Sequence, residues 1–127
     1  MHRIIPVKSV HSTGGIYSHA AAIGATVYIA GQVSLDIAGE LVGRGDPLAQ
    51  VRQVFANLES ILHELGGGFG SVVKYTTYLT DRDHLPAFRL VRDEVLGRPI
   101  PVNTLVFVSG LANPDYLVEI EAIAHLP

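Results

Sequence analysis

Two acidic side chains near the end of the chain are the first candidates for chemistry. Glu119 and Glu121 lie two residues apart in a run that predicts a β-strand, so both carboxylates project from the same face of a sheet. The pattern by itself favours a solvated strand face. The second interpretation is that one carboxylate lies in a cleft and works as a general acid or base.

Histidines are the next candidates, because six of them occur in this chain. Only His11 and His19 share one loop-rich region, and neither has a partner at a spacing typical of a metal site. We therefore expect the histidines to be solvated or hydrogen-bonded, and we expect no metal and no cofactor.

The sequence contains none of the common catalytic motifs. It has no Gly-x-Ser-x-Gly, His-Glu-x-x-His or Walker loop. The glycine-rich run at 66–70 resembles a phosphate cradle only loosely, because it follows a predicted helix and carries no Lys. The chain has no Cys, which excludes a disulfide framework, a thiol nucleophile and a thiolate metal site.

Composition points to a single domain that associates with other subunits. The 127 residues match one domain, 1–127, and only 17% of them are charged against 48% that are hydrophobic. The usual charged share is about 25%, so we expect some apolar surface to lie against another subunit. A net charge of −3 without a like-charge run argues against nucleic acid. No run approaches the roughly 20 apolar residues of a membrane span, so we expect a cytoplasmic protein without membrane contact.

Two helices should position the candidate residues. The first is predicted from Asp46, which can cap it, to Leu65, with Gly66 as its stop. The second is predicted over 84–96, with Asp83 as its cap. Apolar residues recur at three- and four-residue steps in the first helix, as expected for one buried face: Leu48, Val51, Phe55, Leu58, Leu62 and Leu65.

Strands should make up most of the remainder. The clearest β-rich runs are 26–30, which Gly31 is expected to end, together with 72–79, 104–108 and 117–123; two weaker runs are 4–7 and 17–23. This order predicts an α+β fold in which two helices pack on one face of a mixed sheet. The other face would present Val and Leu side chains with no helix to cover them, and a sheet-to-sheet contact between subunits would bury them.

Several of these segments together resemble the Rid family, the reactive intermediate deaminases that are also known as L-PSP endoribonucleases or YjgF-like proteins. The similarity extends over nearly the whole chain. It is carried by Tyr17, residues 29–32 (Ile-Ala-Gly-Gln), Gln50, the strand at 73–81, Pro101-Val102-Asn103-Thr104-Leu105 and Val118-Glu119-Ile120-Glu121-Ala122.

The resemblance implies a chorismate-mutase-like fold of the bacillus type and a homotrimer whose sheets form a central β-barrel. Small ligands would bind in clefts between subunits. Family deaminases hydrolyse enamines and imines such as 2-aminoacrylate: water attacks the imine carbon and ammonia leaves. By resemblance, Tyr17 and Glu119 would be the catalytic residues, and the backbone at Gly31 would bind the substrate.

The chain departs from the family where an Arg grips the substrate carboxylate, because this position is Asn103. An amide is neutral, whereas a guanidinium offers a permanent charge and a two-pronged donor. Arg89, where some family members place a polar Asn that reaches the ligand, is a second candidate for substrate binding; its alternative is a surface residue paired with Asp93.

Two functions remain open at this stage. The first is hydrolytic deamination, or a related water addition, on a small enamine or imine that need not be a simple 2-imino acid. The second is a non-catalytic trimer that binds a small metabolite. Asn103 favours the non-catalytic binding function, whereas the retention of Tyr17, Gly31 and Glu119 favours catalysis.

Overall fold

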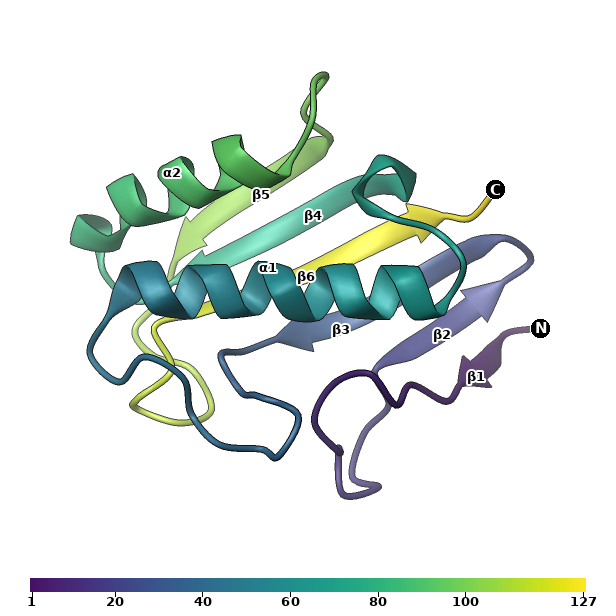
Figure 1. Ribbon diagram of the computed structural model, residues 1–127, viewed down its shortest axis with the longest axis horizontal. Helices are drawn as coiled ribbons and strands as arrows, with labels where there is room; N and C mark the ends of the chain where they lie inside the picture. The colour runs from purple at the N-terminus through teal and green to yellow at the C-terminus, as the bar shows by residue number, and fades with distance from the viewer.

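Six strands form one mixed sheet, and the last strand of the chain lies in its interior (Figure 1). The computed structural model describes residues 1–127. The strand order is β1-β2-β3-β6-β4-β5, and all neighbours are antiparallel except β4 and β5. The elements are β1 (Arg3–Ile5), β2 (Ala20–Ile23), β3 (Thr26–Gln32), α1 (Pro47–Glu64), η1 (Phe69–Ser71), β4 (Val72–Leu79), η2 (Arg82–His84), α2 (Leu85–Val95), β5 (Val102–Phe107) and β6 (Val118–His125).

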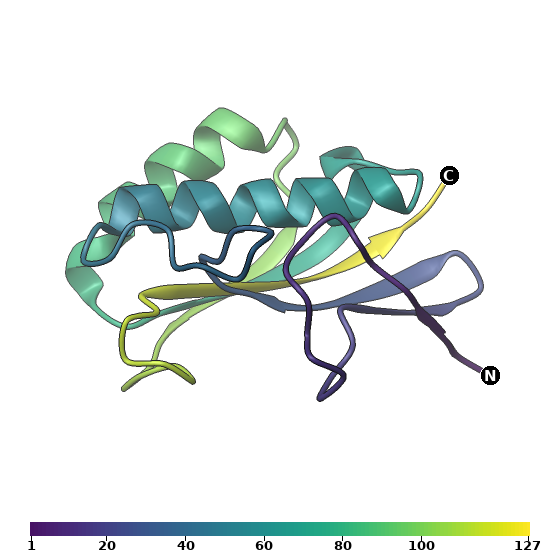
Figure 2. The same ribbon diagram turned by 60° about the horizontal axis from the view of Figure 1, so that its bottom comes forward.

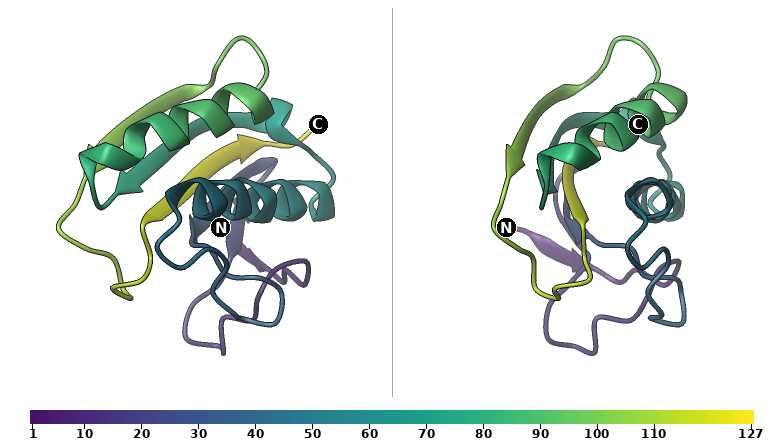
Figure 3. Two further views of the ribbon diagram at one scale, coloured as in Figure 1. Left: turned by 60° about the vertical axis from the view of Figure 1, so that its left-hand side comes forward. Right: turned by 90° about the vertical axis from the view of Figure 1, so that its left-hand side faces the viewer.

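Both α-helices cover the same face of the sheet, which confirms the predicted α+β arrangement (Figures 2 and 3). The core lies between them and the sheet. In β6 the residues at alternate positions from Val118 to Ala124 are buried, and Glu119 and Glu121 point to the opposite face. No helix of the protein is long and apolar enough to cross a bilayer.

The face opposite the helices is open and partly apolar, as predicted. Tyr28 alternates with buried neighbours in β3 and is 47% exposed. Val102 and Val106 pair in register with Lys74 and Tyr78 and are also exposed. A single protomer thus leaves apolar side chains of β3 and β5 in water.

The first helix forms where its capping residues predict. Asp46 accepts a hydrogen bond from the backbone N–H of Ala49, and Pro47 occupies the first turn. At the other end Gly66 has φ = 91°, a conformation that favours glycine, and the N–H of Gly67 returns to the carbonyl of Leu62. The prediction for 46–65 is therefore confirmed, with Asp46 and Leu65 as the two caps.

Two details of the prediction are wrong. Asp83 does not cap α2: it lies inside the 3₁₀ turn η2, and its N–H donates to the carboxylate of Asp81 instead. Gly31 does not end β3, which continues to Gln32 through a shift of register against β6. A glycine is tolerated inside the strand at this point because the irregular pairing brings another side chain close to its backbone.

Candidate functional site

A cavity of about 500 Å³ opens between the loop before β2, the end of β3 and the loop before β6. Tyr17, Gly31 and Glu119 all line it, so the structure brings together three of the five predicted site residues. His11 and Tyr116 line the same cavity and were not predicted. The lining contains one carboxylate and no Lys or Arg.

Gly31 and Glu119 fit against each other where β3 and β6 meet. A Cβ added at Gly31 would overlap the carboxylate of Glu119 and would lie 2.7 Å from its Cδ. The register of the two strands shifts between Ile29 and Gln32, beside this contact. Because Gly31 has no side chain, the Glu119 carboxylate can lie against β3 at this point.

The environment of Glu119 favours its protonated form. Burial raises the pKa of the Glu119 carboxyl above its ordinary value, and the nearby charge of Glu121 raises it further. Glu121 itself is exposed and accepts a hydrogen bond of 2.5 Å from the Tyr78 hydroxyl. The two acids of β6 share one face, as predicted, but only Glu119 lines the cavity.

Tyr17 is held beside the cavity by a histidine. Its ring is 44% exposed, and its Oη lies 3.2 Å from Nε2 of His11, which is buried. Burial, followed by the influence of Tyr116 and Glu119, raises the pKa of the Tyr17 phenol. Tyr17 is therefore a neutral hydroxyl that can donate or accept a hydrogen bond at neutral pH.

Behind Tyr17, two more buried side chains complete what we call the His11 cluster: His11, Tyr17, His19 and Gln32. Nε2 of His19 lies 2.8 Å from the carbonyl of His11, and the Gln32 amide donates to Nδ1 of His19 over 3.0 Å. His11 and His19 are thus hydrogen-bonded, which is one of the two states expected for the histidines. The sequence signal was the isolated pair of histidines in one loop, but nothing in it indicated that the pair is buried.

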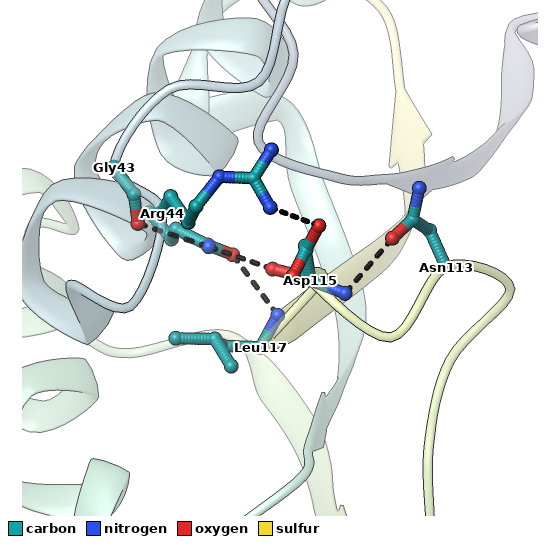
Figure 4. A network of polar contacts seen from close by, with 6 residues as sticks. Gly43, Arg44, Asn113, Asp115 and Leu117 are labelled. Atoms are coloured by element: carbon teal, nitrogen blue, oxygen red, sulfur yellow. Dashed lines mark hydrogen bonds and ion pairs between the residues drawn. The ribbon is translucent and has the colours of Figure 1, made fainter.

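A second polar network fixes the loop that leads into β6 (Figure 4). Gln50, fully buried in α1, donates to the carbonyls of Gly43 and Asp115 and accepts from the N–H of Leu117. Arg44 forms an ion pair with the carboxylate of Asp115 in the same place. We call this set the Gln50 network; it anchors the segment that carries Tyr116 and Glu119.

Asn103 and Arg89 do not line this cavity within the protomer. Asn103 lies on the edge strand β5, exposed, and its amide donates to the carbonyl of Pro101. Arg89 is exposed on α2, and the expected pairing with Asp93 is absent. Asp93 is bound by Arg92 instead, at 3.0 Å, with Arg98 at 3.9 Å, because these two cations lie nearer to its carboxylate.

Candidate metal ligands do not gather anywhere in the molecule: no group of three or more His, Asp or Glu side chains is placed to hold an ion. The cavity itself is lined by one carboxyl group, two phenols, the hydroxyls of Ser12 and Thr13 and a buried imidazole.

Known proteins resemble this chain over nearly its full length. The family model described as Endoribonuclease L-PSP matches residues 8–126. A RutC family protein of Pyrococcus horikoshii is 37% identical, covering 98% of both chains. A 2-iminobutanoate/2-iminopropanoate deaminase of Capra hircus is 32% identical, covering 98% of this chain and 90% of that protein. The crystal structure of RidA from an Antarctic Psychrobacter superimposes with a TM-score of 0.89 at 34% identity, covering 98% and 99% of the two chains.

Proposed function

Because this chain belongs to the Endoribonuclease L-PSP family, to which the Rid proteins belong, we propose that it is a hydrolytic deaminase of a small enamine or imine. The observation that carries the proposal is Glu119, whose carboxyl group lies in a cavity beside Gly31 and Tyr17 with a raised pKa. The relative from Capra hircus, named as a 2-iminobutanoate/2-iminopropanoate deaminase, supports the same reaction class.

Glu119 supplies the proton transfers in this proposal. An enamine first becomes an imine when Glu119 carries a proton from its nitrogen to its carbon. The Glu119 carboxylate then takes a proton from water while the water oxygen bonds to the imine carbon and the C=N electrons move to nitrogen. The resulting carboxylic acid returns that proton to nitrogen. A second proton passes from the new hydroxyl to nitrogen through the same carboxylate, so that ammonia leaves and a carbonyl remains. A raised pKa suits a group that must both accept and donate a proton near neutral pH.

The proposed assembly is a homotrimer in which the open sheet face becomes buried. Tyr28, Val102 and Val106 on that face are apolar and exposed in the protomer. A neighbouring subunit would then bring Asn103 or Arg89 to the rim of each cleft, which the protomer alone does not do. Light scattering at micromolar concentration should give about three times the 13.6 kDa of one chain; a stable monomer would contradict this assembly. The cytoplasmic location stays a prediction.

The substrate is proposed to lack a carboxylate, or to bind it weakly, because the position of the family's Arg is Asn103. Losing a charge-assisted hydrogen bond in a cleft costs about 1.5–3 kcal/mol. Hydrolysis of 2-aminoacrylate, generated in the cuvette by a dehydratase, should therefore be slow, and a neutral enamine of similar size should react faster. Asn103→Arg should narrow that difference.

Arg89 is the alternative source of positive charge for such a cleft. If it binds ligand from a neighbouring subunit, Arg89→Ala should abolish the binding of small carboxylates in a calorimetric titration. Equal binding by the wild type and the variant would leave Arg89 as a surface residue.

A non-catalytic binding trimer is the second candidate, and Asn103 is the observation that favours it. The two functions separate in one experiment. Glu119→Gln should lower enamine hydrolysis at least about 100-fold, as removal of a general acid–base does. Glu121→Gln is the comparison, since this acid lies on the same strand face but outside the cavity; because its charge only contributes to the raised pKa of Glu119, its loss should lower activity far less than Glu119→Gln does. Wild-type protein that binds enamines without accelerating their hydrolysis would favour the binding function.

A further inference from the structure

His11 is a buried polar side chain for which the proposed reaction has no use. It is 4% exposed and lines the cavity, with its ring edge against the ring of His19 at a centroid distance of 4.9 Å. Its Nε2 lies 3.2 Å from the Tyr17 oxygen, and its Nδ1 is buried without any partner. Which nitrogen carries the proton decides what Tyr17 can do.

The neighbouring His19 has one tautomer that satisfies both of its contacts. The Gln32 amide nitrogen can only donate, so Nδ1 of His19 accepts and is bare. The proton then lies on Nε2 of His19, which donates to the carbonyl of His11 over 2.8 Å. These two hydrogen bonds fix the backbone of His11 relative to β3, the strand that carries Gln32.

The surroundings of His11 select its tautomer in the same way. A proton on Nδ1 would bury an N–H with no acceptor, whereas a proton on Nε2 leaves only a bare nitrogen there. Buried N–H groups without a partner are the rarer of the two situations, so the proton belongs on Nε2. The doubly protonated ring would also strand an N–H at Nδ1, and burial, with His19 beside it, holds the pKa of His11 below its ordinary value.

We propose that His11 is a positioning residue that donates from Nε2–H to the Tyr17 oxygen and thereby turns the Tyr17 hydroxyl hydrogen toward the ligand. Tyr17 then acts as a hydrogen-bond donor in the cavity. It donates to the imine nitrogen and draws electrons from the carbon that water attacks, while Glu119 handles the protons. This role rests on the proposed deaminase function, but the tautomer on which it depends does not.

The tautomer can be measured without any substrate. Long-range ¹H–¹⁵N NMR of the ¹⁵N-histidine-labelled protein should show neutral His11 with its proton on Nε2 at pH 7. The signals are assigned to His11 by their loss in His11→Gln. A proton on Nδ1, or a cationic ring, would overturn the inference whether or not the protein is an enzyme.

Two substitutions at His11 test the role. The amide of His11→Gln can donate to Tyr17, whereas His11→Leu cannot. On the best substrate found for the wild type, His11→Leu should lower kcat about tenfold with little change in KM, and His11→Gln should stay within about threefold of wild type, a split expected when a transition-state interaction is lost. Equal activity of the two variants would overturn the proposal, as would a loss in KM alone. If the wild type hydrolyses no enamine, the deaminase proposal fails, and the NMR result still decides the tautomer.

Discussion

The Gln50 network and the His11 cluster are each built around a buried polar side chain, and they differ in how completely the hydrogen bonds of their buried side chains are satisfied. Gln50 uses its two amide hydrogens and its oxygen on three backbone groups. In the His11 cluster, Nδ1 of His11 and the side-chain oxygen of Gln32 have no partner. The Gln50 network ties its loop to α1 and the His11 cluster ties its loop to β3, yet only the His11 cluster leaves polar atoms unsatisfied.

The difference separates two reasons for burying polar groups. A fully satisfied network stabilises one loop geometry, and here it orients the segment that carries Tyr116 and Glu119. An unsatisfied buried group lowers stability, so its retention needs another explanation. The His11 cluster contacts Tyr17 in the cavity, and function is the explanation that we infer for it.

Gln50→Leu should have the largest effect on stability. It leaves the carbonyls of Gly43 and Asp115 and the N–H of Leu117 without their partner, and we expect a loss of about 3 kcal/mol in the free energy of unfolding. Urea denaturation at fixed protein concentration measures it. Gln53→Leu is the control on the same helix, because Gln53 is only partly buried and should cost less. Equal losses would mean that the three hydrogen bonds of the buried Gln50 amide add no more stability than the bonds of a partly buried one.

Gly31→Ala should act on the cavity rather than on stability. Its Cβ would displace the Glu119 carboxylate, which is the movable end of a side chain. We expect kcat/KM for the wild type's best substrate to fall about tenfold, equivalent to about 1.4 kcal/mol, while the urea midpoint stays close to that of the wild type. An unchanged kcat/KM would show that the position of this carboxylate does not matter.

The pH dependence of stability should carry a smaller contribution from Glu119. Since its pKa is higher in the folded protein than in the unfolded chain, the folded state binds more protons between the two values. This contribution is therefore most favourable at acid pH and is lost as the pH rises from about 4.5 through the folded pKa. The stability difference between wild type and Glu119→Gln, measured by urea denaturation across this range, should fall with rising pH. A difference that rises would mean that an unrecognised partner stabilises the carboxylate.

Thr77→Val should have the smallest effect. The hydroxyl of Thr77 is buried in β4 without a partner, so removing it leaves no group behind unsatisfied. We expect stability to stay the same or to rise by up to about 1 kcal/mol. A clear loss would mean that this hydroxyl has a partner in the assembled protein.

Local patterns were enough to predict most of the fold. The bounds of β4 and the caps of α1 follow from residue types that act on their own backbone, such as Asp46 and Gly66. The course of β3 was not predicted: Gly31 was expected to end it, but the strand continues to Gln32 through a register shift, beside the contact between Gly31 and Glu119. That contact joins residues 88 positions apart in sequence, and periodicity carries no information at that distance.

Only part of the site could be predicted, because its residues also lie far apart in the sequence. The choice of Tyr17, Gly31 and Glu119 came from a resemblance, and in the structure these three residues line one cavity. The role inferred for His11 depends on the burial of its ring beside His19, which Gln32 holds in turn. No local pattern in the sequence specifies that burial.

The interior position of β6 also has a consequence for biosynthesis. Residues 118–125 are translated after every other strand, yet they form the only link between β3 and β4 in the sheet. Until this segment has left the ribosome, the hairpin of β2 and β3 and the parallel pair of β4 and β5 present open edges, and such edges can pair with other nascent chains. The sheet therefore cannot close before this segment is available, and a ribosome that stalls before Val118 leaves two half-sheets rather than a smaller domain.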